Sequence, residues 1–98
     1  MSALPFIKPY IDAAPLANGV YGLYDGPELI YIGSASGETG TIRGRLQRHY
    51  SGAEGRCTQQ AAQFECIVTP YPLTTEEEML RNYKAKHGRL PRCNERIG

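Results

Sequence analysis

Polar and apolar residues alternate in two short segments in the first third of the chain. Residues 19–25 read GVYGLYD, and residues 28–33 read ELIYIG. Alternation with a period of two is typical of β-strands. The residues at their junction, Asp25, Gly26 and Pro27, favour a turn. The pattern therefore predicts a β-hairpin over residues 19–33.

Two tyrosines, Tyr21 and Tyr31, stand ten residues apart in this hairpin. An odd-length loop, such as three residues with a bulge, would pair Tyr21 directly with Tyr31. Their Cβ atoms would then lie about 5 Å apart on one face of the sheet. Such a pair can stabilise a sheet, because tyrosine is a common strand residue. It can also direct two hydroxyl groups at one point.

A helix is predicted over residues 41–50, TIRGRLQRHY, with Thr41 as its N-cap and Gly52 near its end. The spacing i, i+3, i+4, i+7 places four residues on one stripe of this helix: Ile42, Arg45, Leu46 and His49. A stripe that mixes two apolar residues with an arginine and a histidine is unusual for a purely structural face.

Two further elements complete the predicted fold. Residues 62–69, AQFECIVT, alternate as a third strand, and residues 74–88, TTEEEMLRNYKAKHG, have the composition of a helix. Thr74 and Glu77 have the spacing of a capping box, three acids fill the expected first turn, and Gly88 is the expected C-cap. The order predicts one α+β domain over residues 1–98, a three-stranded antiparallel sheet flanked by helices.

The composition fits a globular protein and restricts the other classes. The chain has 98 residues, of which 41% are hydrophobic, and no apolar run is long enough to cross a membrane. Residues 1–15 lack the apolar stretch of a signal peptide, so we expect a cytoplasmic protein without a membrane partner. Three cysteines without a C-x-x-C pair predict neither a disulfide framework nor a zinc site.

Charge is spread unevenly although the net charge is only +1. Residues 1–40 hold one lysine and four acids, a local −3; residues 41–56 hold four arginines and one acid, +3; residues 79–98 hold six basic groups and one acid, +5. Two basic segments that converge would suit a phosphate backbone. Two solvated helix faces explain the same distribution.

The order of short motifs resembles the GIY-YIG nuclease family. Gly19-Val20-Tyr21 and Tyr31-Ile32-Gly33 match the two strand signatures that give the family its name. Arg45 and His49 match an arginine followed four residues later by histidine or tyrosine. The later motifs are matched over residues 76–94 by Glu76, Met79, Leu80, Tyr83, Pro91 and Asn94. The likeness spans residues 19–94, and five elements in the right order make an accidental match improbable.

The resemblance implies a metal-dependent endonuclease that hydrolyses DNA phosphodiester bonds and leaves 5′-phosphate and 3′-hydroxyl ends. Tyr21 would act as the general base, and Tyr31 would position water or phosphate. Arg45 would stabilise phosphate charge, and His49 would hydrogen-bond a tyrosine or transfer a proton. Glu76 would hold one Mg²⁺ or Mn²⁺ ion, weakly without substrate. The remaining residues expected at the site are Arg43, Arg48 and Lys84 for substrate binding, and Gly19, Gly33 and Asn94 for structure.

Three consecutive glutamates compete for the role of metal ligand. Glu77 has an alternative explanation as a capping residue. Glu76 shares a helical stripe with Leu80 and Tyr83, at i, i+4 and i+7, which places it on the buried face. Glu76 is therefore the expected ligand, with Glu77 as the alternative.

The chain departs from the family pattern in two places. Ser34 and Ala35 follow the second signature, where several members carry a lysine, and residues 85–90 resemble an insertion before Pro91. Because 98 residues leave no room for one, we also expect no attached recognition or partner domain. Cleavage of structured or damaged DNA, as in DNA repair, or work within a homodimer or with a partner protein would fit these features. The alternative is a nucleic-acid-binding or protein-interaction module that retains the fold without catalysis.

Overall fold

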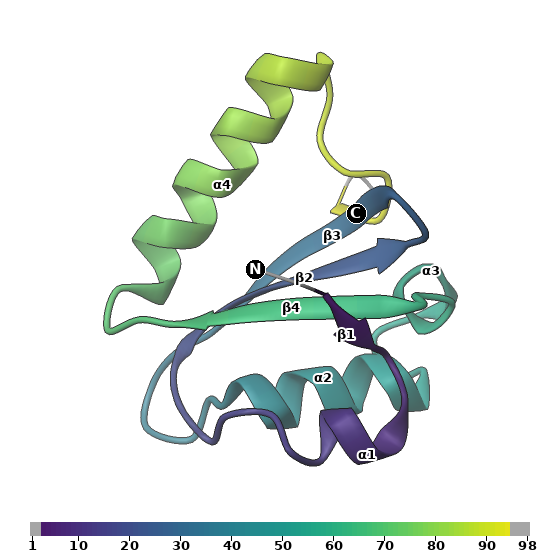
Figure 1. Cartoon of the computed structure of the whole chain (residues 1–98). Helices are drawn as coiled ribbons and strands as arrows, with labels where there is room; N and C mark the ends of the chain where they lie inside the picture. Colours follow the sequence, from purple (N-terminus) through teal and green to yellow (C-terminus); the bar gives the residue numbers. More distant parts are fainter. Residues whose placement is uncertain (1–2, 95–98) are drawn as a thin grey trace.

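The computed structural model describes residues 3–94 (Figure 1). Along the chain these residues form the elements β1 (Leu4–Pro5), α1 (Lys8–Ile11), β2 (Gly19–Asp25), β3 (Glu28–Ala35), α2 (Ile42–Ser51), α3 (Arg56–Gln59), β4 (Gln63–Val68) and α4 (Pro72–His87). The α+β class is confirmed. No helix within this range is both long and apolar enough to cross a membrane.

Within residues 3–94 the sheet has four antiparallel strands in the order β1-β4-β2-β3, one more than predicted. The additional strand, β1, is only two residues long and pairs Leu4 with Phe64. A strand this short shows no alternation, so the sequence pattern could not indicate it. The order places β3 at one edge of the sheet.

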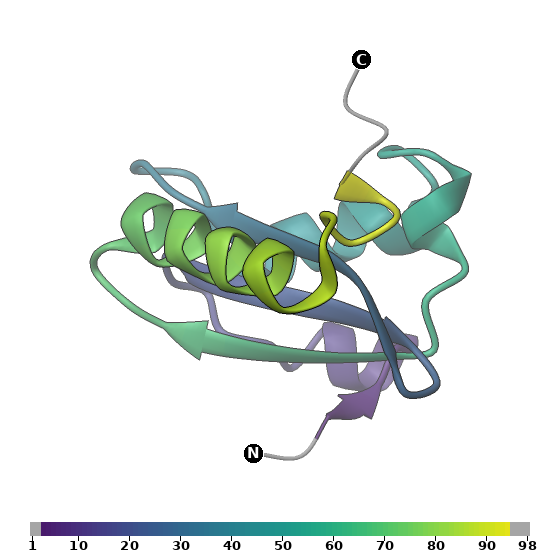
Figure 2. The same cartoon turned by 90° about the horizontal axis from the view of Figure 1, so that it is seen from above.

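Helices cover both faces of the sheet (Figures 1 and 2). The helices α1 and α2 lie on one face, and α4 lies on the other. The main core fills the space between the sheet and α2, and its fully buried members include Leu23, Ile30, Ile42, Leu46 and Phe64. Burial of these side chains holds α2 against the strands that carry the two signatures.

The predicted hairpin is confirmed, but its register differs from the predicted one. A two-residue turn joins Asp25 to Glu28, and a bulge shifts the ladder between Leu23 and Tyr24. Tyr21 therefore pairs with Gly33, and Tyr31 pairs with Leu23. The direct pairing of Tyr21 with Tyr31 was wrong, because the bulge lies beyond the loop and the shift separates the tyrosines by one diagonal step. They still share a face, with ring centroids 6.2 Å apart.

The helix boundaries test the capping predictions. The Thr41 hydroxyl accepts a hydrogen bond from the Gly44 amide at 2.9 Å, and Gly52 ends α2 in the left-handed region, so both predicted ends of this helix are confirmed. Gly88 ends α4 in the same conformation, as predicted.

The start of α4 was predicted wrongly. This helix begins at Pro72, with Tyr71 as an N-cap that makes no side-chain capping bond, and it has no acid in its first turn. The capping box at Thr74 is therefore wrong. Proline is favoured at the first helical position because its missing amide hydrogen would have no partner there, and Pro72 starts the helix before the threonine pair.

The cysteines also differ from the prediction. Cys57 and Cys93 form a disulfide, with their Cα atoms 5.6 Å apart and a sequence separation of 36. Only tertiary folding brings α3 beside the segment that follows α4, so the spacing gave no sign of the pair. Cys66 is a free, half-buried thiol. The cysteine content therefore no longer supports the expected cytoplasmic location.

Candidate active site

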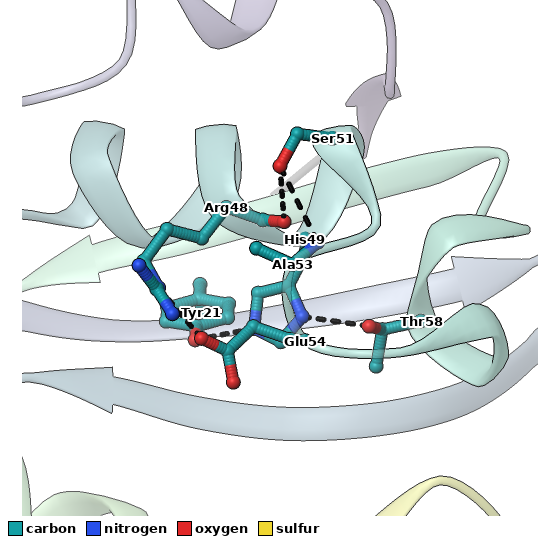
Figure 3. A network of polar contacts seen from close by, with 7 residues as sticks. All are labelled: Tyr21, Arg48, His49, Ser51, Ala53, Glu54 and Thr58. Atoms are coloured by element: carbon teal, nitrogen blue, oxygen red, sulfur yellow. Dashed lines mark hydrogen bonds and ion pairs between the residues drawn. The ribbon is translucent and has the colours of Figure 1, made fainter.

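A hydrogen-bonded chain of three buried side chains joins β2, α2 and α3 (Figure 3). The Tyr21 hydroxyl lies 2.9 Å from Nε2 of His49, and Nδ1 of His49 lies 2.7 Å from Oγ1 of Thr58. All three residues are at most 4% exposed. Both ring nitrogens of His49 therefore have partners, and the position of the imidazole is fixed from both sides.

Burial determines the ionisation states of Tyr21 and His49 in this hydrogen-bonded network. Desolvation lowers the pKa of His49 to about 4, so the imidazole is neutral at physiological pH. Desolvation also raises the pKa of Tyr21 far above its usual value, and the neighbouring Tyr31 adds to this effect. Tyr21 is thus a neutral phenol that can exchange its proton with a neutral imidazole.

Tyr31 lies beside the same imidazole. Its ring centroid is 4.9 Å from that of His49, and it is less buried than Tyr21. Desolvation raises the pKa of Tyr31, and the negative charge of Glu76 raises it further. Tyr31 therefore presents a neutral hydroxyl at the edge of the cluster, where a substrate could reach it.

Glu76 is the glutamate that α4 directs toward the sheet. The Ser34 hydroxyl on β3 donates a hydrogen bond of 2.9 Å to Glu76 Oε1, and the carboxylate is half-buried. Glu77 is exposed and pairs with Arg81 at 2.9 Å one turn away on the same helix. Of the two candidate ligands, only Glu76 lies on the face of α4 that contacts the strands.

Groups from both faces of the sheet come close to the edge strand β3. The aromatic cluster approaches from the α2 face, whereas Glu76 reaches Ser34 from α4 on the other face. Because β3 is an edge strand, a ligand at this edge can contact groups from both faces. The charge of Glu76 acts on both Tyr21 and Tyr31, so the carboxylate belongs to the same electrostatic site.

The donor set fits only a weakly held metal ion. Within residues 3–94 no three histidine, cysteine, aspartate or glutamate side chains lie close enough together to hold a metal. Glu76 alone suits an ion such as Mg²⁺, which binds one or two carboxylates and retains several waters.

The arginines of α2 point in different directions. The exposed guanidinium of Arg45 is near enough for its positive charge to act on the pKa of Tyr21, Tyr31 and His49. Arg48 pairs with Glu54 at 2.6 Å beside the cluster (Figure 3). Arg43 donates its Nε to the carbonyl of Ala14, on the side of α2 toward the α1 segment. The structure thus does not bring Arg43 to the site where substrate binding was expected.

Two glycines and one asparagine shape the backbone of the site. A Cβ at Gly19 would collide with the Ile67 carbonyl oxygen, and one at Gly33 would overlap the Tyr21 ring. Asn94 forms two hydrogen bonds with the main chain of Ile32: its Oδ1 accepts from the amide, and its Nδ2 donates to the carbonyl. The predicted insertion before Pro91 does not displace Asn94 from the β3 edge.

Three polar residues of the site were missed by sequence reasoning. Thr58 fixes His49, Ser34 contacts Glu76, and Glu54 adds a negative charge beside His49. Ser34 directly follows the second signature, which is a signal that could have found it. Thr58 lies in a segment without periodicity, and only folding places it against α2.

A cleft opens beside the cluster. Its volume is about 270 Å³, and its lining includes Tyr31, His49, Glu54 and both cysteines of the disulfide. A larger groove, which we call the α4 groove, has a volume of about 660 Å³ and lies between α4 and the β2–β3 hairpin. It is lined by Pro27, Glu28, Leu29, Ile32, Met79, Asn82, Tyr83, Lys86, His87 and Arg89. Lys84, expected to bind substrate, is exposed on α4 outside this lining.

Comparison with solved structures identifies the architecture. The GIY-YIG N-terminal endonuclease domain of UvrC from Thermotoga maritima, bound to its catalytic magnesium, matches with a TM-score of 0.56 and 23% identity. The match covers 85% of this chain and 96% of that chain. This chain has the GIY-YIG domain fold.

Variants of the same UvrC domain give the same result. A variant with an asparagine replaced by alanine matches this chain with a TM-score of 0.56 and 23% identity, over 85% of this chain and 94% of that one. A variant with a tyrosine replaced by phenylalanine matches with a TM-score of 0.56 and 22% identity, over 85% and 96%. Both variants are bound to a catalytic divalent cation. No protein-family model matches the sequence, and no curated protein matches it.

Proposed function

We propose that this chain is a metal-dependent endonuclease that hydrolyses DNA phosphodiester bonds at the β3 edge of its sheet. The observation that carries the proposal is the contact of Tyr21 with a buried, neutral His49, beside the cation Arg45 and the carboxylate Glu76. These groups supply a proton acceptor, a positive charge for phosphate and a metal ligand. The GIY-YIG fold, shared with a magnesium-bound endonuclease domain, supports the same assignment.

The proton of the attacking water is transferred through Tyr21. In the tautomer with a proton on Nδ1, His49 donates to Thr58 and accepts the Tyr21 hydroxyl at Nε2. The Tyr21 oxygen then keeps its lone pairs available to accept a proton from the attacking water. As this oxygen takes the water proton, the phenol proton passes to Nε2 of His49, which becomes an imidazolium, so Tyr21 never becomes a free anion. Desolvation disfavours this cation, and the negative charge of Glu54 offsets part of that effect. This route is necessary because burial raises the pKa of Tyr21.

The remaining groups act on the phosphate. The Arg45 guanidinium is permanently charged and can form two parallel hydrogen bonds with phosphate oxygens. The Tyr31 hydroxyl donates to a phosphate oxygen or to the attacking water. Glu76 would hold the divalent cation with its carboxylate, and a bound Mg²⁺ or Mn²⁺ would supply positive charge for the phosphate and the leaving oxygen.

The α4 groove receives the nucleotides next to the cut. Its apolar lining, Leu29, Ile32 and Met79, and the ring of Tyr83 suit the face of a nucleobase. Lys86 and Arg89 on the rim attract the phosphate backbone. Met79 lies one helical turn beyond Glu76, so the groove begins beside the metal ligand. A groove of this kind favours DNA with unpaired nucleotides, such as flaps and branches.

Cleavage of labelled DNA tests the proposal. Duplex, branched and single-stranded DNA are incubated with the protein and Mg²⁺ or Mn²⁺, and Glu76→Ala is compared with Glu77→Ala. Cutting that requires the metal, disappears in Glu76→Ala and persists in Glu77→Ala is the expected result. Glu77 is a matched control because it stands on the same turn but faces solvent.

Two outcomes would contradict the proposal. If Glu77→Ala loses activity while Glu76→Ala retains it, the assignment of the metal ligand is wrong. If the folded wild-type protein binds DNA but cuts none of the substrates, the non-catalytic binding module becomes the better explanation.

A further inference from the structure

We propose that the Cys57–Cys93 disulfide is a positioning element of this site, and that its reduction slows the reaction. The inference rests on the proposed nuclease function for its effect on rate. Its structural part, the positioning of His49 and Tyr31, does not depend on that function.

The disulfide joins the two segments that support the site. Cys57 directly precedes Thr58, which hydrogen-bonds His49, and Cys93 directly precedes Asn94, which hydrogen-bonds Ile32. Thr58 and Asn94 are both 4% exposed. One covalent bond therefore links the segment that holds the His49 imidazole, through Thr58, to the segment that holds β3, through Asn94.

The segment that follows α4, residues 88–94, which we call the tail, fixes the main chain on both sides of Tyr31. The Cys93 amide donates to the Ile30 carbonyl at 2.9 Å, and Asn94 bonds both the amide and the carbonyl of Ile32. Tyr31 stands between these two isoleucines in sequence. A shift of the tail would therefore move the backbone that carries Tyr31.

Apart from the hydrogen bonds of Thr58, Cys93 and Asn94, the restraints on these two segments are weak. The helix α3 has only four residues and no side-chain cap, and an isolated helix of this length is not stable in water. Near the tail, Arg92 pairs with Asp25 and Glu28 at 3.2 and 2.9 Å, but these partly exposed ion pairs contribute little. The disulfide is therefore the main covalent restraint that holds α3 and the tail against the site.

The disulfide borders a cleft, which is the route of approach for a small thiol. Both cysteines line the cleft of about 270 Å³ beside Tyr31 and His49. A thiolate of a dithiol reductant attacks one sulfur, which breaks the Cys57–Cys93 bond and forms a mixed disulfide. The second thiol of the reductant then attacks that mixed disulfide. The protein gains two electrons and two protons as two thiols, and the reductant becomes a cyclic disulfide.

The first experiment compares the oxidised and reduced forms of the whole chain. Oxidation is verified by mass spectrometry of unreduced peptides, and folding of the reduced form is verified by circular dichroism. Because misplacement of reacting groups by about 1 Å can cost 100-fold in rate, we expect kcat on labelled DNA to fall by about 10- to 100-fold on reduction. KM should change much less. Cys57→Ser/Cys93→Ser should match the reduced protein, and Cys66→Ser should behave as wild type in both states.

A second readout does not require activity. In the oxidised protein desolvation of the His49 ring lowers its pKa to about 4. Release of α3 admits water to the ring, and the His49 titration measured by NMR should move upward, toward the usual value for histidine. If the protein cuts no DNA, the proposed function fails, and this titration alone decides whether the disulfide positions His49.

The inference is overturned if the folded, reduced protein keeps the His49 titration of the oxidised form. It is also overturned if reduced and oxidised proteins cut DNA equally fast. If the reduced chain does not fold, Thr58→Val in the oxidised protein replaces the test. This variant retains the disulfide but removes the bond to His49, and it should reproduce both the loss of kcat and the shifted titration. Unchanged values in Thr58→Val would overturn the role of α3.

Discussion

Gly33 lies against the ring of Tyr21, its partner across the β2–β3 ladder. A Cβ at position 33 would stand 2.6 Å from both Cζ and Oη of Tyr21, and 2.7 Å from Cε2 of Tyr31. Because Gly33, which ends the second signature, has no side chain, the ring of Tyr21 can occupy the space next to it. A side chain here would displace the hydroxyl that bonds His49.

Replacement of this glycine should damage both packing and activity. In Gly33→Ala the new Cβ overlaps the buried Tyr21 ring, so we expect a loss of about 1–3 kcal/mol in the free energy of unfolding. Nuclease activity should fall at least 10-fold, because the Tyr21 hydroxyl moves from its partner. Urea unfolding and the cleavage assay measure the two effects. Gly22→Ala is the control: it lies on the opposite face of β2, its new Cβ would meet Leu29 Cδ1 at 3.1 Å, and it should cost less in both assays.

Removal of the Tyr21 hydroxyl should abolish the proton relay. In Tyr21→Phe the ring remains in the core, but the water loses its acceptor, and we expect kcat to fall by about 100- to 10,000-fold. His49 Nε2 loses its partner as well, which costs about 1–3 kcal/mol of stability. Single-turnover cleavage and thermal unfolding test these values. Tyr71→Phe, at a residue that is 70% exposed, should change neither, and an active Tyr21→Phe would exclude Tyr21 as the proton acceptor.

The stability of the protein should fall between pH 6.5 and pH 4 because of His49. The folded-state pKa of His49 is about 4, below its unfolded value of 6.5, so in this range the unfolded chain binds more protons than the folded one. The contribution is fully present above pH 6.5 and is lost as the pH falls toward 4. Over this window the free energy of unfolding should drop by about 3 kcal/mol from this group alone. Urea unfolding at several pH values measures the slope, and His49→Gln should be less pH-dependent than wild type. Equal slopes would contradict the desolvated state of His49.

Ser34 should tune the affinity for the metal ion. Its hydroxyl donates to Glu76 Oε1 at 2.9 Å and orients the carboxylate. Loss of such a support typically weakens metal binding by about 10- to 100-fold, so Ser34→Ala should require more Mg²⁺ or Mn²⁺ for half-maximal cleavage. The rate at saturating metal should change much less. Titration of activity with Mn²⁺ tests this, with Ser51→Ala at the exposed end of α2 as the control. An unchanged metal requirement would show that Glu76 needs no orientation by Ser34.

The basic rim of the α4 groove should contribute to DNA affinity. Lys86→Ala/Arg89→Ala removes two cations from the lining, so binding should weaken. The slope of the logarithm of the binding constant against the logarithm of the salt concentration should become shallower by the equivalent of about two phosphate contacts. Fluorescence anisotropy of labelled flap DNA at several salt concentrations measures both quantities. The control is Lys8→Ala, a change at an exposed ion pair on α1, across the sheet from α4. If the double variant and this control bind alike, the DNA follows another path.

Much of the fold followed from local chemistry. Alternation placed the hairpin and the β4 strand, the 3.6-residue period placed α2, and Thr41, Gly52 and Gly88 marked helix ends because only local backbone geometry is needed for a cap. Glu76 was selected over its neighbours by helical periodicity, which determines the direction of a side chain once the helix exists. The order of the motifs indicated the GIY-YIG fold, which the solved structures match.

The tertiary structure decided what depends on contacts between distant segments. The bulge in the hairpin set the register, so Gly33 and not Tyr31 lies opposite Tyr21. Thr58 reached His49, and Cys57 reached Cys93, because α3 and the tail pack against the same core. The neutral state of His49 is likewise a product of burial, which no local sequence pattern encodes. The sequence by itself determined which chemical groups are present and which face of their own element they occupy. Only packing determined which of them meet, because a contact across many residues depends on the whole fold.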